Sequence, residues 1–294
     1  MSLKKIHQIK EKYGTDDIVE MVHTFLTEEN AQNQQRRIEE GRLGKFYPSS
    51  VGRCQRAVAY QMQGYPTKPI NGQSLLIMEN GTSFHNRMED IFERMGILIA
   101  PELSLKHKEL RISGRSDAII WNFLLDKGEP PGEEISLFRK EQVEIQEGDE
   151  LKKVEEDIEV YRGPNNHILI VEFKSIKSKN FHKLPKTKPE KKHEMQLQLY
   201  FKLTGIRRGL VYYENKDTQE TKYYFVEYDE AMVEETIAYI KDIIRYVDGH
   251  DLPEREGNPL DIMCRYCDFR NICHIPVSEE EWLSIYFDEQ EDAA

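Results

Sequence analysis

Residues 168–175 read ILIVEFKS, and this stretch decides the fold. Its four aliphatic residues are too few for a globular helix and are rich in β-branched side chains, so they predict a strand buried on both faces. Alternate residues of a strand point the same way, so Glu172 and Lys174 share one face where this strand ends. Because a buried charge is costly unless it is paired or binds something, these residues form either a structural ion pair or part of a site.

The composition indicates a folded protein without a membrane span. The chain has 294 residues, 38% of them hydrophobic, which is enough for one large core or two modest domains. The first residues, MSLKKIHQIKEK, carry lysines with no apolar stretch behind them, so we expect no secretory signal and an intracellular, cytoplasmic protein. Thiols stay reduced there, so the four cysteines are expected to bind metal rather than form disulfides.

The net charge of −12 is distributed unevenly. Residues 174–192 contain eight lysines and one acid, a net charge of +7, so the rest of the chain carries −19. Residues 122–166 hold 13 acids against 6 bases, and the segment from Ser278 onward holds seven acids and no base. A basic patch on an acidic body is suited to a phosphate backbone, although a solvated charged loop gives the same pattern. The candidate phosphate contacts are Lys177, Lys179, Lys183, Lys186, Lys188, Lys191 and Lys192.

The N-terminal half is predicted to contain three helices followed by three strands. Residues 16–40 carry apolar side chains at helical spacing, and RCQRAVAYQM at 53–62 indicates a short helix. Thr82 is placed to cap a third helix, which runs to about Met95. Strand-like segments follow at 97–105, 109–113 and 117–121.

The C-terminal half is predicted to continue the same core after an insertion. Residues 122–166 contain PPG and a long acidic stretch, which favours an insertion, with a hairpin of its own, between two core strands. The later elements are the ILIVEF strand, a helix from about Glu190 to Thr204 that ends at Gly205, strands at 209–214 and 222–228, and an amphipathic helix at 229–248. This order predicts an α/β fold in which helices flank a central mixed sheet.

Asp117 is a second acid that could lie beside Glu172. It opens the apolar strand of ISGRSDAII, and it would neighbour Glu172 if the two strands pair. Two close carboxylates repel each other unless a cation neutralises them, and oxygen ligands suit Mg²⁺ or Mn²⁺. Such a metal generates a nucleophile from bound water at neutral pH, and a nearby lysine neutralises charge that builds on a phosphate. Asp117, Glu172 and Lys174 are therefore suited to phosphodiester hydrolysis.

The cysteines form a second candidate site. Cys264, Cys267 and Cys273 make a C-x2-C-x5-C pattern, and Cys54 lies some 210 residues upstream. Clustered thiolates are ligands for zinc or for an iron–sulfur cluster, and spacing alone does not choose between them. Inert buried thiols are the alternative, which three cysteines within ten residues disfavour.

The acids and the lysine resemble the bipartite motif of the PD-(D/E)XK nuclease superfamily. In this resemblance SDAII supplies Asp117 as the first acid, and VEFK supplies Glu172 as the second acid and Lys174 as the lysine. Ser116 stands where the family usually has proline, and 54 residues separate the two acids, so the resemblance requires the insertion.

Two further motifs are similar to the RecB-type branch of that superfamily. QLQLY resembles its glutamine–tyrosine helix motif, which implies site roles for Gln196 and Tyr200. GTSFH resembles its histidine motif, which implies that His85 is a metal ligand together with Asp117 and Glu172. Each motif has a simpler interpretation, since a lone histidine is often a packed core residue and a glutamine and tyrosine one turn apart often only pack.

One cysteine before these motifs and three after them resemble the iron–sulfur nucleases related to Cas4 and the AddB nuclease domain. The resemblance implies a [4Fe–4S] cluster that holds the two ends of the domain together, with zinc as the alternative. It implies a restriction-endonuclease-like domain at 48–275, between an N-terminal helical segment at 1–47 and an acidic tail at 276–294.

The leading hypothesis is therefore a metal-dependent DNA nuclease, an exonuclease on single strands or free ends. Its expected partners are DNA and proteins of recombination, replication or CRISPR adaptation. The alternatives are a non-catalytic DNA-binding or adaptor module on the nuclease fold, and a zinc-stabilised protein whose acids form structural pairs. The intact trio of Asp117, Glu172 and Lys174 disfavours a module without catalysis.

Overall fold

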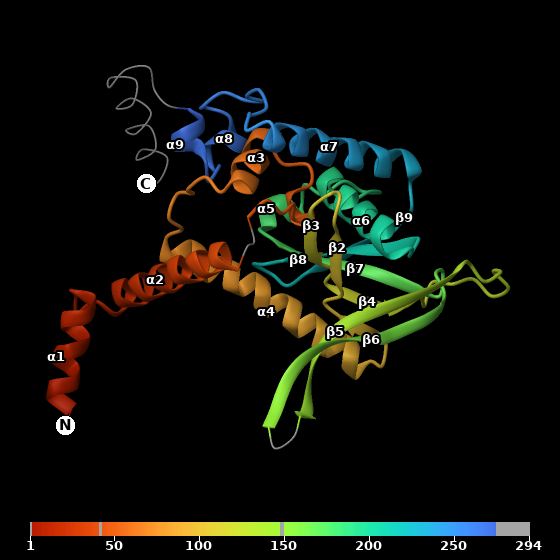
Figure 1. The fold of residues 1–294 in the computed structure, drawn as a ribbon, viewed down its shortest axis with the longest axis horizontal. Helices are drawn as coiled ribbons and strands as arrows, with labels where there is room; N and C mark the ends of the chain where they lie inside the picture. Colours follow the sequence, from red (N-terminus) through yellow and green to blue (C-terminus); the bar gives the residue numbers. More distant parts are fainter. Residues whose placement is uncertain (1, 41–42, 148–149, 275–294) are drawn as a thin grey trace.

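The centre of the structure is a mixed five-stranded sheet. The computed structural model describes residues 2–40, 43–147 and 150–274. The spatial order of the strands is β1 (Leu98–Pro101), β4 (Ala118–Trp121), β7 (Ile168–Ile176), β8 (Arg208–Asn215) and β9 (Thr221–Glu227). β7 and β8 run parallel and the other neighbours run antiparallel (Figure 1). The predicted mixed sheet is confirmed.

The strand β7 lies in the middle of this sheet and is covered on both faces. Residues Ile168–Phe173 are all buried. Ile170 packs with the core formed by α6 (Lys191–Thr204), and Val171 packs with the core formed by α4 (Gly72–Arg94). A strand enclosed by helices needs apolar side chains at successive positions, which explains the ILIV run.

The helix α6 is the crossover between the parallel strands β7 and β8. It ends at Gly205, as predicted, where a φ of +80° suits glycine because glycine has no Cβ to clash. α7 (Glu230–Asp248) packs against α6 and against α3 (Gln55–Gln63). The predicted helix at 229–248 and the two strands before it are confirmed.

The helix α4 begins at Gly72, so the predicted cap at Thr82 is wrong. Asn71 caps the helix instead and accepts a backbone hydrogen bond at 2.8 Å. The first residue of the helix is a glycine, whose low helix propensity is offset by packing against α2 (Ile18–Glu39). The two helices approach so closely that a Cβ added to Gly72 would lie 2.4 Å from the Cα of His23.

The N-terminal helices extend from one side of the sheet. The predicted helix at 16–40 is α2, which Asp17 caps with a hydrogen bond of 2.7 Å. α1 (Ser2–Tyr13) precedes it and was not predicted, because its apolar residues Ile6 and Ile9 stay exposed and leave no clear core stripe. Figure 1 shows α2 and then α1 extending to the left of the sheet, with the N-terminus at the far end of α1.

The segment before β4 folds differently from the prediction. The expected strand at 97–105 is divided into β1 and β2 (Ser104–His107) at Glu102, whose φ is +42°. β2 pairs with β3 (Ile112–Arg115) in a hairpin separate from the central sheet. A pattern of apolar residues does not reveal a positive φ at a single residue, so the sequence predicted one strand where the structure has two.

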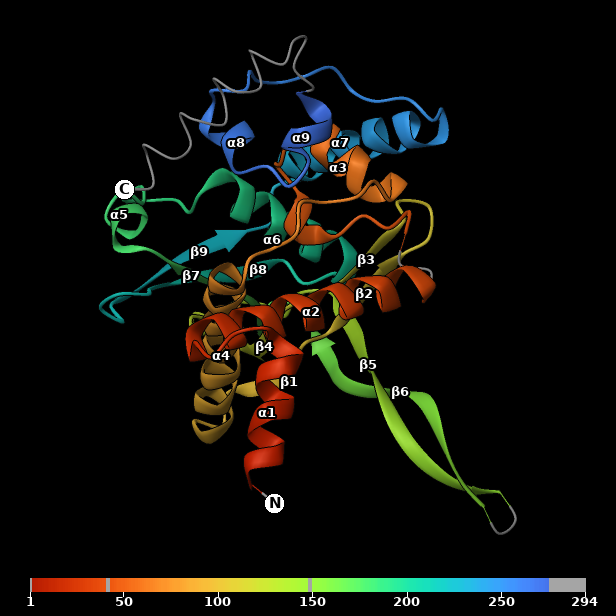
Figure 2. The same cartoon turned by 90° about the vertical axis from the view of Figure 1, so that its left-hand side faces the viewer.

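Between β4 and β7, where an insertion was predicted, the chain forms a long hairpin. β5 (Glu134–Glu147) pairs antiparallel with β6 (Glu150–Pro164), and the hairpin projects from the body as a two-stranded arm (Figures 1 and 2). Leu137 and Tyr161 at its base are buried in the main core. The hairpin thus accounts for most of the separation between the two candidate acids.

The acidic tail predicted at 276–294 lies outside the described residues. Within the described residues, no helix is long and apolar enough to cross a membrane.

Candidate active site

Strand pairing brings Asp117 and Glu172 together. Ala118 at the start of β4 pairs with Val171 of β7, so the preceding and following residues, Asp117 and Glu172, are neighbours at this register. The Phe173 N–H donates a hydrogen bond of 2.7 Å to Asp117 Oδ2, which holds this carboxylate against β7. The pairing assumed in the sequence analysis is therefore present in spite of the long insertion.

Glu172 is a buried carboxylate with a hydrogen bond to only one of its two oxygens among the described residues. The residue is 2% exposed, and its Oε1 accepts a hydrogen bond of 2.5 Å from Lys174 Nζ. Its Oε2 is buried without a hydrogen-bond partner among the described residues. Burial, together with the nearby charge of Asp117, raises the pKa of Glu172 to about 7. Glu172 and Lys174 share one face, as the strand alternation predicted.

His85 approaches the same acids from α4. Its Nδ1 lies 3.3 Å from Asp117 Oδ1. Burial disfavours the imidazolium, but the hydrogen bond with Asp117 and the surrounding carboxylates outweigh burial and raise the pKa of His85. Glu89 lies one helical turn further along α4, and burial followed by the charges of Glu102 and Asp117 raises its pKa. Sequence reasoning missed Glu89, although its spacing of four residues from His85 was a signal.

Gln196 and Tyr200 position Lys174 from the other side. Lys174 Nζ donates to Gln196 Oε1 at 3.2 Å, and Gln196 Nε2 donates to the Tyr200 hydroxyl at 2.7 Å. The hydroxyl in turn donates to the Arg115 carbonyl at 3.0 Å. Both side chains on α6 are buried, so this relay fixes the amine in place. The structure thus brings together all six residues predicted for the catalytic and metal sites, which are His85, Asp117, Glu172, Lys174, Gln196 and Tyr200.

His193 is a further buried residue that sequence reasoning did not single out. The Tyr213 hydroxyl accepts from the Glu190 N–H at 3.2 Å and is therefore free to donate its own proton to His193 Nδ1, 2.7 Å away. Burial, and then the charge of Lys174, lowers the pKa of His193 to about 2. A neutral ring adds no second positive charge beside Lys174. The available signal was its position one turn before Gln196 on the same helix face.

The acids have the chemistry of a site for a hard divalent cation. Glu172 Oε2 is an unpartnered buried oxygen beside a second carboxylate, and a cation would relieve both its desolvation and its repulsion from Asp117. In the structure Glu172 Oε1 faces Lys174 and Asp117 Oδ2 faces a backbone amide. In the described part of the chain, no group of three or more His, Cys, Asp or Glu side chains is arranged as a metal site.

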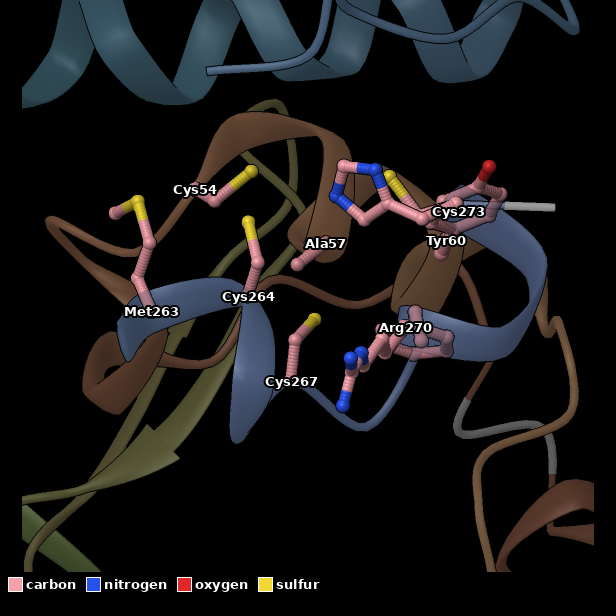
Figure 3. A pocket seen from close by; sticks show the side chains of 10 residues that line it. Cys54, Ala57, Tyr60, Met263, Cys264, Cys267, Arg270 and Cys273 are labelled. Carbon is pink, nitrogen blue, oxygen red and sulfur yellow. The ribbon is translucent and has the colours of Figure 1, made fainter. Parts of the chain in front are cut away.

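The four cysteines line one pocket, where the start of α3 meets residues 263–274. Cys54 precedes α3, Cys264 lies in α8 (Ile262–Arg265), and Cys273 ends α9 (Arg270–Cys273). Figure 3 shows the sulfur atoms of Cys54, Cys264 and Cys267 turned toward a common space, with Cys273 at its side. All four are free thiols, so the disulfide alternative is not realised in the structure.

The environment of these thiols suits a bound metal or cluster. Burial is the largest cause of the raised pKa of Cys54, and the charge of Glu256 adds to it. Burial, followed by the charges of Cys54 and Cys273, raises the pKa of Cys264. Burial is also the largest cause of the raised pKa of Cys267. Thiolates gathered in a partly buried pocket repel one another, and a metal centre would relieve that repulsion. The residue types therefore suit the predicted metal centre, but within the described residues these cysteines do not form a group arranged to hold a metal ion.

The predicted DNA-contacting lysines lie between β7 and the start of α6, in a segment that contains the short helix α5 (Ser178–Phe181). All seven are exposed. Lys191 pairs with Glu235 at 2.7 Å and Lys192 pairs with Glu190 at 3.0 Å. The other five, which form no ion pair within the described residues, are called here the lysine loop and are Lys177, Lys179, Lys183, Lys186 and Lys188.

The family model of the PD-(D/E)XK nuclease superfamily matches residues 157–274. The matched range includes Glu172, Lys174 and the α6 motif, together with the three C-terminal cysteines, and it begins after Asp117. Residues 157–274 are thus similar to the PD-(D/E)XK nuclease superfamily, and this match supports a nuclease.

No curated protein matches the sequence. Among solved structures, the crystal structure of SSO0001 is 18% identical with a TM-score of 0.47, and the match covers 88% of this chain and 98% of that chain. An alkaline exonuclease (LHK-Exo) from Laribacter hongkongensis is 14% identical with a TM-score of 0.42, covering 72% of this chain and 91% of that chain. Both TM-scores lie below 0.5, so the assignment of function rests on the family match and on the site itself.

Proposed function

We propose that this protein is a metal-dependent nuclease that hydrolyses phosphodiester bonds in DNA. The observation that carries the proposal is Glu172 Oε2, a buried carboxylate oxygen without a partner among the described residues. It lies in a site where Asp117, Lys174 and His85 converge. A purely structural ion pair would satisfy both oxygens of a buried carboxylate, whereas a cation site needs one of them available.

Each side chain of the site has a distinct task in this mechanism. Asp117, Glu172 and His85 would hold Mg²⁺ or Mn²⁺, which when bound supplies an acidified water at neutral pH. Lys174, held between Glu172 and Gln196, is a fixed cation for the charge that develops on the phosphate. Tyr200 keeps the Gln196 amide oriented, so that its oxygen faces the amine.

The finer proposal is a RecB-like, Cas4-like iron–sulfur nuclease that acts as an exonuclease on single strands or DNA ends. It is supported by the four cysteines around one pocket, which would hold a [4Fe–4S] cluster, with zinc as the alternative. The lysine loop, with Lys191 and Lys192, is proposed to contact the DNA backbone. Proteins of recombination, replication or CRISPR adaptation are the proposed partners.

Cleavage of end-labelled single-stranded and double-stranded DNA with Mg²⁺ or Mn²⁺ tests the proposed reaction. The wild-type protein should release labelled products only with a divalent metal, and Asp117→Asn, Glu172→Gln and Lys174→Met should abolish cleavage. The matched control is Glu129→Gln, which removes a carboxylate that pairs with Arg208 at 2.7 Å. The control should cleave as the wild type does.

Two outcomes would contradict the proposal. Near-wild-type cleavage by Glu172→Gln would remove Glu172 from the reaction. Binding of DNA by the wild type without cleavage under any metal condition would favour the non-catalytic module. Circular single-stranded DNA in the same assay distinguishes an exonuclease from an endonuclease, because an exonuclease leaves a circle intact.

Metal analysis of protein purified without oxygen tests the cysteine centre. Iron with acid-labile sulfide and a brown colour supports the cluster. Colourless protein with stoichiometric zinc would replace the cluster with a structural zinc site.

A further inference from the structure

The hairpin β2–β3 presents a polar face beside the candidate active site. Its register pairs Ser104 with Arg115 and Lys106 with Ser113, and residues paired directly across two strands point to the same face. Leu105, the neighbour of Lys106 in β2, is buried on the opposite face. The hairpin is thus anchored by its apolar side and offers its charged side to solvent.

The chain before η1 (Pro48–Ser50) extends this polar face as a third extended segment. The Phe46 N–H donates to the Arg111 carbonyl at 2.9 Å, and the Ser113 N–H donates to the Phe46 carbonyl at 3.0 Å. Phe46 is fully buried, so its neighbours on either side point away from the core. The three segments line one open groove, called here the hairpin groove, whose main lining residues are Lys45, Tyr47, Lys106, Lys108, Arg111 and Arg115.

The hairpin groove is strongly basic on an acidic protein. Five of its lining side chains are Lys or Arg, and Glu40 is the one acid among the described lining residues, whereas the whole chain carries −12. Arg111 pairs with Asp248 at 2.5 Å and Arg115 pairs with Glu102 at 2.6 Å, which offsets two of the positive charges. The three lysines are exposed, and none forms an ion pair within the described chain. Such a concentration of uncompensated charge attracts a polyanion.

One lining residue connects the groove to the candidate active site. Arg115 lines the groove, and its carbonyl accepts the 3.0 Å hydrogen bond from Tyr200 that ends the relay from Lys174. Asp117 follows two residues later in the same chain segment. A polyanion bound beside Arg115 would therefore lie close along the chain to Asp117.

We propose that the hairpin groove binds the sugar–phosphate backbone of a single DNA strand on one side of the active site. The lysine loop is a separate surface, since Figure 2 shows α5 well apart from β2 and β3, with α6 drawn between them. Tyr47 supplies an aromatic ring in the groove, which suits stacking of an unpaired base. The inference rests on the proposed function in taking the bound strand to be the substrate.

Binding of a fluorescein-labelled single-stranded oligonucleotide, measured in EDTA at several salt concentrations, tests the groove without cleavage. The test variant replaces Lys45, Lys106 and Lys108 with Gln. The matched control replaces Lys127, Lys202 and Lys241 with Gln, which removes the same charge from exposed positions outside the groove. Each backbone contact changes the slope of log affinity against log salt by roughly 0.7 on single strands. The test variant should therefore flatten the slope by about 2 and bind more weakly at low salt.

The control variant should keep a slope near that of the wild type. Lys106→Gln alone, compared with Lys241→Gln, repeats the comparison with a single change, so the result does not depend on folding of the triple variant. Equal slopes for the test and control variants would overturn the inference. Tighter binding of the matching duplex or RNA than of single-stranded DNA would overturn the choice of ligand.

The outcomes also separate this inference from the proposed function. If the wild type cleaves DNA and the groove variants bind like the control variants, DNA binding by the hairpin groove is rejected and the nuclease proposal is kept. If the wild type never cleaves but the groove variants lose binding, the nuclease proposal is rejected and the hairpin groove is kept as a DNA-binding surface.

Discussion

Glu172 is the residue whose surroundings are hardest to explain without a ligand. Its pKa is raised to about 7, mainly by burial, and Asp117 adds repulsion. Lys174 offsets part of this penalty, and burial opposes the ammonium, yet Glu172 and Asp117 outweigh burial and keep the pKa of Lys174 raised. The Lys174 amine therefore stays protonated, whereas the Glu172 carboxyl takes up a proton near neutral pH. A cation bound beside Glu172 would lower its pKa and favour the carboxylate.

Metal binding should therefore depend on pH through Glu172. Below pH 7 a metal ion must displace a proton from Glu172, so the affinity for Mn²⁺ should rise by up to about tenfold per pH unit toward pH 7 and then level off. Calorimetric titration of Mn²⁺ at pH 6, 7 and 8 measures this, and Glu172→Gln should bind weakly at every pH. A wild-type affinity that is flat across this range would contradict the assignment.

The same shift predicts how stability depends on pH without metal. The native pKa of about 7 lies above the ordinary value of 4.5, so between them the folded state binds more protons than the unfolded state. Stability should then fall as pH rises through this window in EDTA. Denaturant unfolding at pH 5 and pH 8 checks the sign, since Glu172→Gln should lose this part of the decline and Glu129→Gln should not.

Sequence reasoning found most of the residues that gather at this site. Asp117, Glu172 and Lys174 follow from strand alternation and the acid pair, because the relevant contacts are set by backbone register. Glu89 and His193 were missed because each is defined by packing between elements distant in sequence. Their spacing along a helix predicts which face they share, but not what that face meets.

At the scale of elements, prediction succeeded where one pattern dominates. β7 is a continuous apolar run and α6 ends at a glycine, so both were placed correctly. It failed where tertiary contacts decide. One such place is the start of α4, where Gly72 packs on α2, and the other is Glu102, where one residue with a positive φ separates β1 from β2.

The β5–β6 arm should be dispensable for folding beyond its base. Among its described residues, the buried hydrophobic side chains are Leu137 and Tyr161 at the base, and a two-stranded ribbon adds little stability on its own. Replacing 141–156 with an Asn-Gly turn between Lys140 and Asp157, which are paired, should leave the melting temperature nearly unchanged.

Leu137→Ala is the contrasting change at the base of the arm. It removes buried volume from the main core and should cost about 2 to 5 kcal/mol of unfolding free energy. Thermal and denaturant unfolding compare the two variants. A large loss of stability on shortening the arm would mean that its outer part packs against the body.

The lysine loop gives a prediction that is independent of the hairpin groove. Replacing Lys183, Lys186 and Lys188 with Gln should flatten the salt dependence of single-strand binding by about 2, again at roughly 0.7 per contact. Mn²⁺ binding should not change, because these lysines are exposed and none is a partner of the acids. An unchanged salt slope would mean that the loop is only a solvated segment and that the DNA is held elsewhere.

Across the molecule as a whole, the start of α3 and the segment at 256–273 are in contact at the cysteine pocket. The Gln55 N–H donates to Glu256 Oε1 at 2.6 Å, and Tyr60 stacks on Phe269 with ring centroids 5.4 Å apart. Ala57 completes a small core with these rings, separate from the cores that flank the sheet. The junction therefore has protein contacts of its own, and a metal centre would reinforce them.

Loss of one thiol should consequently loosen the junction while leaving the sheet folded. A cross-link that closes a loop of about 200 residues contributes up to about 5 kcal/mol on loop-closure estimates, and the protein contacts already made here reduce that figure. Cys267→Ser should lower the melting temperature by several degrees, remove bound metal, and open residues 252–274 to limited proteolysis. Because the sheet and α6 have separate cores, the far-ultraviolet circular dichroism should change little.

Phe269→Leu is the matched control, since it weakens the packing but keeps all four thiols, and it should retain metal. If Cys267→Ser keeps both its metal and its resistance to protease, the cysteines do not hold the two ends together through a metal centre.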